Sequence, residues 1–231
     1  MQKLLKQILT SKVYEVAIET PLEESAVLSQ ALNNRILLKR EDLQPVFSFK
    51  LRGAYNRIVN LTVEERARGV ITASAGNHAQ GVAFSGQKLG IKTTIVMPVT
   101  TPAIKISAVK SYGATVVLCG DNYSEAAEHC ALLVAQSGMI FIPPFDDELV
   151  IAGQGTVANE LLRQTAGNMD AVFIPVGGGG LLAGMAVFLK ALCPEVKVIG
   201  VEPVDSDAMA QSLDAGRRVK LDSVGIFADG V

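Results

Sequence analysis

The stretch AVFIPVGGGGLLAG, residues 171–184, indicates how this chain of 231 residues folds. Residues 171–176 form an apolar run with β-branched side chains, which is typical of a buried strand. Four glycines follow at residues 177–180, and a run with helical spacing begins at Leu181. A strand that turns tightly into a helix is the repeating unit of parallel sheets covered by helices.

The same alternation of strand and helix continues along the rest of the chain. Strands are predicted at residues 35–39, 70–73, 93–97, 115–118, 139–142, 171–176 and 196–201. Helices are predicted at residues 77–89, 102–111, 124–136, 153–164, 181–192 and 206–215. Thr101 is expected to cap one of these helices, with Pro102 as its first helical residue. We therefore expect an α/β protein with parallel sheets, helices on both faces and right-handed crossovers.

Composition argues against several classes of partner. A net charge of −2 offers no basic surface for nucleic acid. No apolar run reaches the roughly 18 residues that a membrane helix needs, and residues 1–12 lack the features of a secretory signal. The three cysteines show no CxxC spacing and no cluster with histidine. We expect a cytoplasmic protein that binds no metal, no nucleic acid and no membrane.

Ligands of parallel α/β sheets bind beyond the carboxyl ends of the strands, where three loops carry unusual residues. In the first loop, glycines 177–180 let the backbone approach a ligand closely and present N–H groups at a helix N-terminus. Such a loop suits a phosphate or a carboxylate, and the alternative is a plain flexible turn. The loop matches neither GxGxxG nor GxxxxGK[ST], which weakens a nucleotide-binding interpretation.

The second loop, ASAGNHAQG at residues 73–81, also joins a strand to a helix. Ser74, Gly76 and Asn77 place small and amide groups at the helix start, where they can bind a carboxylate. Asn77 can instead serve only as the helix N-cap. His78 is predicted to be a hydrogen-bonded structural residue, because nothing in the sequence pairs it with a nucleophile.

The third loop, SFKLRG at residues 48–53, places Lys50 between Phe49 and Leu51. Apolar surroundings lower the pKa of an ammonium group, and the neutral amine can form a Schiff base with a carbonyl. The alternative is a lysine that reaches solvent at the start of a helix. Taken together, the three loops predict a phosphorylated aldehyde cofactor and an amino-acid substrate, a combination that pyridoxal phosphate matches.

Four motifs carry a resemblance to a known family: SFKLRGAYN (48–56), ASAGNHAQGV (73–82), PPFDDELVIAGQGT (143–156) and FIPVGGGGLLAG (173–184). They resemble the threonine dehydratase (threonine ammonia-lyase) family of fold-type II pyridoxal-phosphate enzymes, and more closely its biosynthetic form. The resemblance implies two parallel-sheet α/β domains of the tryptophan-synthase-β-like kind. Residues 47–144 would form the smaller, inserted domain, and residues 1–46 and 145–231 the larger, cofactor-binding domain.

The resemblance also implies a role for each residue of the three loops. Lys50 would bind the cofactor as a Schiff base and remove the α-proton of the substrate. Asn77 would hydrogen-bond the ring hydroxyl of the cofactor. The cofactor phosphate would be held by the backbone N–H groups of Gly177, Gly178, Gly179, Gly180 and Leu181. The substrate carboxylate would be held by the loop of Ser74, Ala75 and Gly76.

The implied reaction converts L-threonine to 2-oxobutanoate and ammonia for isoleucine biosynthesis, with serine as a secondary substrate and a homodimer or homotetramer as the assembly. The sequence stops at Val231. The resemblance therefore predicts that the larger domain is incomplete, that the isoleucine-binding regulatory domain is absent and that activity is weak or lacking. Four alternatives stay open: a serine racemase or dehydratase of the same fold, a β-replacing synthase, a nucleotide-binding α/β module, and a non-catalytic fragment.

Overall fold

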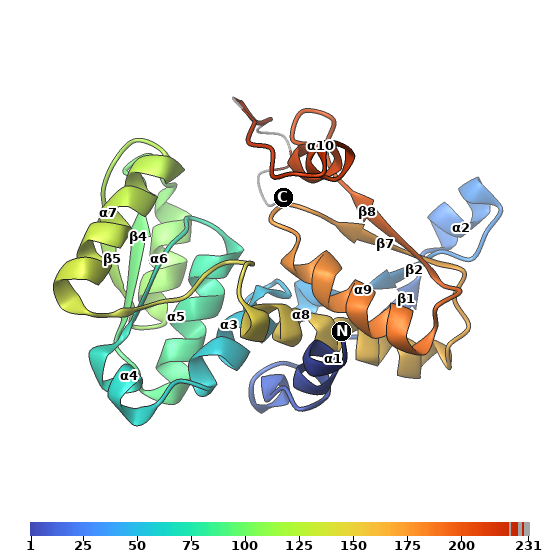
Figure 1. Cartoon of the computed structure of the whole chain (residues 1–231), viewed down its shortest axis with the longest axis horizontal. Coiled ribbons are helices and arrows are strands. Elements are labelled where there is room, and N and C mark those ends of the chain that lie inside the picture. Colours follow the sequence, from blue (N-terminus) through green and yellow to red (C-terminus); the bar gives the residue numbers. More distant parts are fainter. Residues whose placement is uncertain (222, 226–227, 229–231) are drawn as a thin grey trace.

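The computed structural model describes residues 1–221, 223–225 and 228, and its elements form two groups that lie side by side (Figure 1). The first group is built on a parallel four-stranded sheet with the order β5-β4-β3-β6. The second group contains the parallel pair β7 and β8. The bounds of these strands are β3 (Val70–Ala73), β4 (Thr93–Met97), β5 (Thr115–Leu118), β6 (Ile140–Phe141), β7 (Ala171–Pro175) and β8 (Lys197–Val201).

Helices cover these sheets and connect the two groups (Figure 1). Their bounds are α1 (Gln2–Leu9), α2 (Ala26–Leu32), α3 (Lys50–Val59), α4 (Val63–Arg68), α5 (Asn77–Leu89), α6 (Ala103–Ser111), α7 (Tyr123–Ser137), α8 (Glu148–Thr165), α9 (Gly180–Leu192) and α10 (Ala208–Ala215). Two short 3₁₀ helices lie at Val13–Glu15 and Glu41–Leu43. Within the described residues, no helix is long and apolar enough to cross a membrane.

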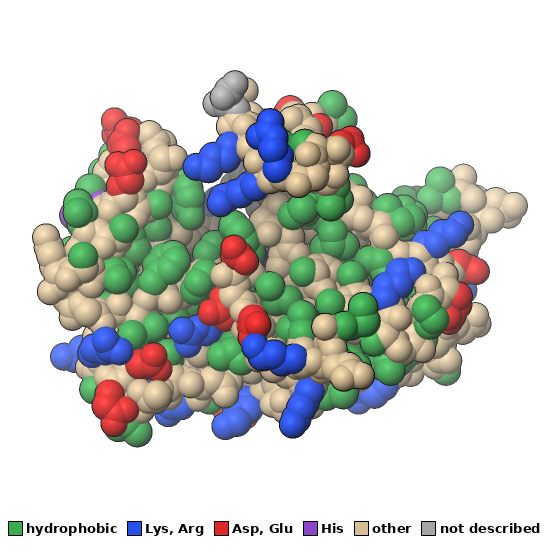
Figure 2. Space-filling view, viewed as in Figure 1, with side chains coloured by type: hydrophobic (Ala, Val, Ile, Leu, Met, Phe, Trp, Pro, Cys, Tyr) green, Lys and Arg blue, Asp and Glu red, His purple; other side chains and the backbone are tan. Residues whose placement is uncertain are grey.

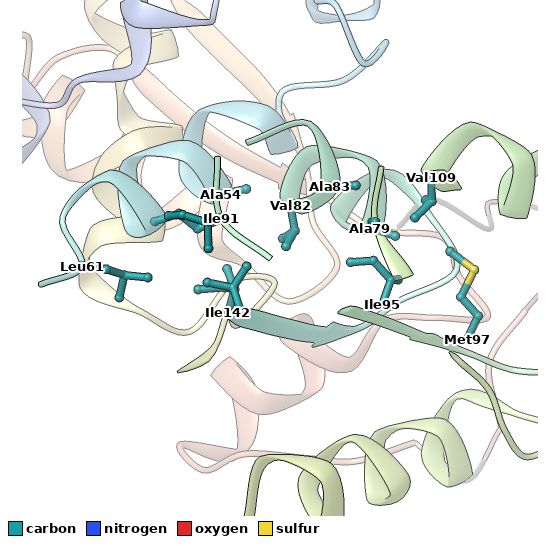
Figure 3. Packing of buried hydrophobic residues seen from close by; sticks show 13 residues of the cluster. Ala54, Leu61, Ala79, Val82, Ala83, Ile91, Ile95, Met97, Val109 and Ile142 are labelled. Atoms are coloured by element: carbon teal, nitrogen blue, oxygen red, sulfur yellow. The ribbon is translucent and has the colours of Figure 1, made fainter. Parts of the chain in front are cut away.

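The central strand β3 is buried along its whole length because helices cover both of its faces. On one face, Val70 and Ile95 pack in one cluster with residues of α5 such as Val82, and Figure 3 shows Ile95 and Val82 within this cluster. On the other face, Ile71 packs in a cluster with Cys130 of α7. Successive side chains of a strand point to opposite faces, so a strand covered twice needs an unbroken apolar run.

In the second group, α9 covers one face of the pair β7 and β8. Ile174 of β7 packs there with Phe188 of α9 and with Ile8 of α1. The next residue along β7 toward the N-terminus, Phe173, points the other way and is 67% exposed. The long helix α8 packs against both α1 and α9 and supplies much of this second core.

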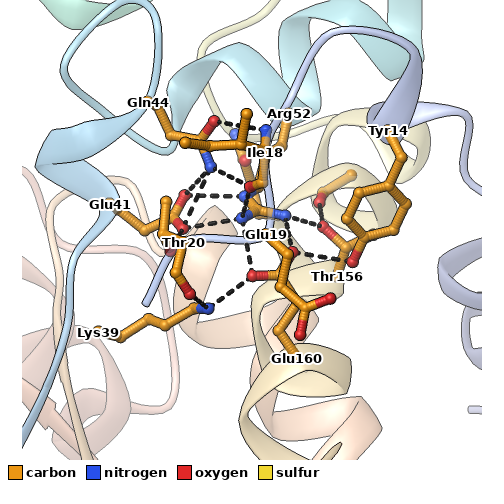
Figure 4. A network of polar contacts seen from close by, with 12 residues as sticks. Tyr14, Ile18, Glu19, Thr20, Lys39, Glu41, Gln44, Arg52, Thr156 and Glu160 are labelled. Atoms are coloured by element: carbon orange, nitrogen blue, oxygen red, sulfur yellow. Dashed lines mark hydrogen bonds and ion pairs between the residues drawn. The ribbon is translucent and has the colours of Figure 1, made fainter. Parts of the chain in front are cut away.

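Helix α3 packs against α5 of the first group and against α8 of the second. A buried polar network strengthens the second contact (Figure 4). Its centre is Arg52 of α3, which is fully buried and pairs with Glu160 of α8 at 2.5 Å and with Glu41 at 2.8 Å. The division into residues 47–144 and the rest of the chain stays a prediction, and Val231 lies outside the described residues.

Most predicted elements are present, and two predictions about local structure are wrong. Residues 37–39 form β2, which pairs with β1 (Leu22–Glu24) in an antiparallel and not a parallel sheet. A parallel partner would require a crossover that returns the chain to its starting end, whereas the segment through α2 reverses its direction. Pro102 is the N-cap of α6 and not its first residue, and no described residue bonds to the buried Thr101 hydroxyl.

Candidate active site

The three loops that the sequence singled out meet at one cavity of about 650 Å³, called the central cavity below. The loop after β3 reaches it from the first group, and the glycine loop after β7 reaches it from the second. All of the predicted site residues line it: Lys50, Ser74, Ala75, Gly76, Asn77, Gly177, Gly178, Gly179, Gly180 and Leu181. Their individual roles stay predictions.

Lys50 is the first residue of α3, and its half-buried side chain lies at the edge of the cavity. Its Nζ atom donates a hydrogen bond to the carbonyl oxygen of Pro144 at 3.2 Å and lies 5.4 Å from the centre of the Phe49 ring. Burial lowers the pKa of Lys50, because desolvation disfavours the charged ammonium. The side chain is therefore suited to react as a neutral amine.

The loop at residues 74–76 passes from the end of β3 into α5. The Ser74 backbone N–H donates to the carbonyl of Val96, and the Ser74 hydroxyl accepts a hydrogen bond from the N–H of Gly76 at 3.2 Å. Gly76 is the N-cap of α5, so the prediction that Asn77 caps this helix is wrong. Asn77 is instead the first helical residue, and its exposed side chain is available to a ligand in the cavity.

The glycine loop leads directly into α9, a helix of 13 residues. Gly179 is the N-cap, and its φ of +83° is a conformation that glycine adopts far more readily than other residues. A Cβ atom at Gly178 would lie 2.1 Å from the ring of Phe145, so the loop packs closely on that ring. The loop thus brings backbone N–H groups and the positive end of a helix to the cavity, as a phosphate site requires.

His78 lies in the first turn of α5 and is almost completely buried. Its Nε2 atom lies 3.0 Å from the carbonyl oxygen of Ile142. Burial lowers the pKa of His78 to about 4, with a smaller contribution from the nearby charge of Lys50 and against the raising effect of the hydrogen bond to Ile142. A neutral, hydrogen-bonded imidazole agrees with the prediction that this residue is structural.

Sequence reasoning did not single out several other residues that line the cavity, among them Phe145, Gln154 and Arg218. Phe145 and Gln154 lie within the third quoted motif, but nothing in their spacing marks them as binding residues. Arg218 follows α10, where Lys and Arg side chains gather at the top of the view in Figure 2. No pattern in the sequence could have linked this segment to the cavity.

The residues that line the central cavity fit pyridoxal phosphate. The volume of the cavity lies within the range of about 300–1,000 Å³ that is typical of small-molecule sites. The desolvated amine of Lys50 can bond to an aldehyde, and the N–H groups of the glycine loop can bind a phosphate. One site therefore offers a partner for the aldehyde of this cofactor and a partner for its phosphate.

Comparison with known proteins agrees with this assignment. Residues 13–231 match the family described as "Pyridoxal-phosphate dependent enzyme". The chain therefore belongs to this family of pyridoxal-phosphate dependent enzymes, and its fold is the tryptophan-synthase-β-like fold of that family.

Within the family, the chain is similar to threonine dehydratases. It is 60% identical over 227 residues to "Threonine dehydratase biosynthetic, chloroplastic" of Arabidopsis thaliana, an alignment that covers 98% of this chain and 38% of that protein. The solved structure of the processed form of threonine deaminase isoform 2 from Solanum lycopersicum matches with a TM-score of 0.97 and 56% identity, over 100% of this chain and 67% of that one. Maize serine racemase matches with a TM-score of 0.93 and 32% identity, over 99% and 69%. These matches confirm the resemblance that the motifs carry, and the chain spans less than half the length of its Arabidopsis relative.

Proposed function

We propose that this chain carries the catalytic site of a threonine dehydratase, which converts L-threonine to 2-oxobutanoate and ammonia in isoleucine biosynthesis and accepts serine as a secondary substrate. The observation that supports this proposal most is the meeting of Lys50 and the N-terminus of α9 in one cavity. The relatives named threonine dehydratase or threonine deaminase share the whole of this region.

Lys50 would hold the aldehyde of the cofactor and then accept the proton from the α-carbon of threonine at Nζ. Bound pyridoxal phosphate supplies an electron sink, which makes that proton acidic. Burial beside Phe49 and Pro144 lowers the pKa of the amine, which favours the neutral form that acts as a nucleophile and as a base.

The other loop residues would position the reactants around Lys50. Gly177 to Leu181 would bind the phosphate, and Asn77 would hydrogen-bond the ring hydroxyl. Ser74, Ala75 and Gly76 would hold the substrate carboxylate at the start of α5, where the helix dipole favours a negative charge. Fixing both ligands in one orientation lowers the entropic barrier to proton transfer.

Two further parts of the proposal come from the sequence: its composition predicts the location, and the resemblance implies the assembly. The protein would be cytoplasmic, and it would assemble as a homodimer or homotetramer. The Arabidopsis relative is named as chloroplastic, so the location needs its own test by cell fractionation. Sedimentation of the purified chain would give its oligomeric state.

A trapping experiment tests the cofactor site. The purified chain is incubated with pyridoxal phosphate, reduced with borohydride and mapped by peptide mass, with Lys50→Ala as a variant and Lys12→Ala as a control. We expect an adduct on Lys50 that the Lys50→Ala variant lacks and the control keeps. A folded chain without an adduct at Lys50 would remove this residue from the mechanism and favour a nucleotide-binding module.

A second assay separates the lyase from its alternatives. With L-threonine, a dehydratase releases 2-oxobutanoate, whereas a serine racemase converts L-serine to the other enantiomer. A chain that binds the cofactor at Lys50 but performs neither reaction would support the non-catalytic alternative for these 231 residues.

A further inference from the structure

Gln154 connects the central cavity to the helix that begins at Lys50. It belongs to α8, is 1% exposed and lines the cavity. Its Oε1 atom accepts a hydrogen bond from the backbone N–H of Gly53, in the first turn of α3, at 3.1 Å. Gly53 is the fourth residue of α3, whose N-cap is Phe49. Gln154 therefore joins α8 to the first turn of α3 through this hydrogen bond.

The other end of the same amide has no hydrogen-bond partner in the part of the chain that the structure describes. The Nε2 atom of Gln154 is buried, and none of the described residues accepts a hydrogen bond from it. The orientation of the amide group is determined, because its oxygen must face the N–H of Gly53. A Cβ atom at Gly53 would lie only 2.4 Å from Nε2, so the amide lies closely against the first turn of α3.

Gln44 shows how a glutamine with a purely structural role behaves in this fold. It is as deeply buried as Gln154, at 1% exposure. Its Oε1 accepts from the N–H of Ile18 at 3.1 Å, and its Nε2 donates to the carbonyl of Ile18 at 2.8 Å. Buried polar groups almost always have a partner, so the buried Nε2 donor of Gln154, a residue that lines the central cavity, calls for one.

We propose that Gln154 is a binding and positioning residue of the central cavity. Its Oε1 holds the first turn of the Lys50 helix in place, and its Nε2 donates a hydrogen bond to an oxygen of the molecule bound beside Lys50. That oxygen belongs to the cofactor or to the amino acid. The inference rests on the proposed function, because that function supplies both ligands.

The test compares three variants of the full 231-residue chain. Gln154→Met removes both amide groups, Gln154→Glu keeps the acceptor for Gly53 but loses the donor, and Gln44→Met is the control for loss of a buried amide. Pyridoxal phosphate is titrated by absorbance, and the KM for threonine is measured at saturating cofactor. We expect about a tenfold rise in one of these two constants for both Gln154 variants, as loss of one buried hydrogen bond implies. Gln44→Met should lower the unfolding midpoint and leave both constants within about twofold.

The two constants identify the acceptor, because a rise in the cofactor Kd points to the cofactor and a rise in KM alone points to the amino acid. For Gln154→Glu, the deficit relative to the wild type should shrink as the pH falls, since a protonated carboxyl regains a donor. A merely structural role would not produce this pH dependence. Both constants unchanged in Gln154→Glu, or an equal loss in Gln44→Met, would overturn the inference. Failure of the wild-type chain to bind pyridoxal phosphate would overturn the proposed function itself and the inference with it.

Discussion

Burial lowers the pKa of two basic side chains that line the central cavity, Lys50 and His78. The pKa of Lys50 is lowered because its ammonium is desolvated, although Nζ keeps one acceptor in the carbonyl of Pro144. The pKa of His78 falls to about 4 mainly through burial, so this imidazole is neutral near pH 7. We therefore propose that proton transfer near neutral pH involves Lys50 and not His78.

His78 should make the stability of the fold depend on pH. Its pKa is about 4 in the folded chain and about 6.5 in the unfolded chain, so below pH 6.5 the unfolded state binds the proton more tightly. The free energy of unfolding should fall as the pH drops from about 6.5 toward 4. Urea unfolding of the wild type and of His78→Gln over this range measures the effect, and the variant should show the shallower slope. Equal slopes would show that His78 titrates normally.

The conformation of Gly179 predicts a specific effect on ligand binding. Gly179→Ala should lose about 1 kcal/mol of stability, because φ is +83° there. Gly216 is a matched control: its φ is +62°, and a Cβ atom there would meet nothing within 4 Å. Both variants should lower the unfolding midpoint, but only Gly179→Ala should weaken binding of pyridoxal phosphate. Equal affinities in isothermal titration would argue against a phosphate site at this loop.

At the scale of elements, the position of α3 depends on its buried polar contacts with α8. Arg52 of α3 pairs with Glu160 of α8, whose carboxylate also pairs with Lys39 at 2.6 Å and accepts a hydrogen bond from the Tyr14 hydroxyl (Figure 4). Burial and the charge of Glu160 raise the pKa of Tyr14 to about 12. Burial also opposes ionisation of Glu160, but the bonds from Arg52 and Lys39 outweigh it, and the pKa of Glu160 is lowered. The network thus holds the helix that presents Lys50.

Removing Arg52 should be far more harmful than removing an exposed arginine. Arg52→Met leaves the buried carboxylate of Glu160 without its closest cation, and we expect a loss on the order of 3 kcal/mol. Arg163→Met, on the same helix α8 as Glu160, breaks an exposed pair with Glu19 and should lose less than about 1 kcal/mol. Guanidinium unfolding of both variants measures the difference, and similar losses would mean that the network adds no more than a surface pair.

The element predictions succeeded where one face or both faces of an element are apolar. Strands β3, β4 and β5 and helix α5 have the predicted bounds, because continuous apolar runs mark the strands and apolar residues at helical spacing mark α5. Helix α3 was not predicted, because Arg52 and Asn56 occupy buried positions and hide its apolar face. Helix α2 was not predicted either, and none of its residues is buried.

At the scale of the whole molecule, the central cavity depends on both groups of elements at once. The loop of Ser74 to Asn77 comes from the first group, the glycine loop comes from the second, and α3 packs against both (Figure 1). A ligand held by all three should therefore stabilise both groups together.

Hydrogen exchange can test this coupling. Pyridoxal phosphate at about 100 times its Kd should add about 2.7 kcal/mol to the free energy of unfolding. Peptides that cover residues 70–89 and residues 171–192 should both become more protected, and Lys50→Ala should show less protection in both. Protection confined to one of these segments would mean that the ligand binds one group alone.

The chemistry of this protein could be inferred from contiguous motifs, because Lys50 with its apolar neighbours and glycines 177–180 carry their properties locally. Folding decided the rest. The packing of α3 on α8 brings Lys50 to the glycine loop, places the Pro144 carbonyl at its amine and leaves the Nε2 of Gln154 without a described acceptor. These contacts join residues that are far apart in the chain, so the local spacing of residues in the sequence does not predict them. They exist because the fold buries those segments against one another.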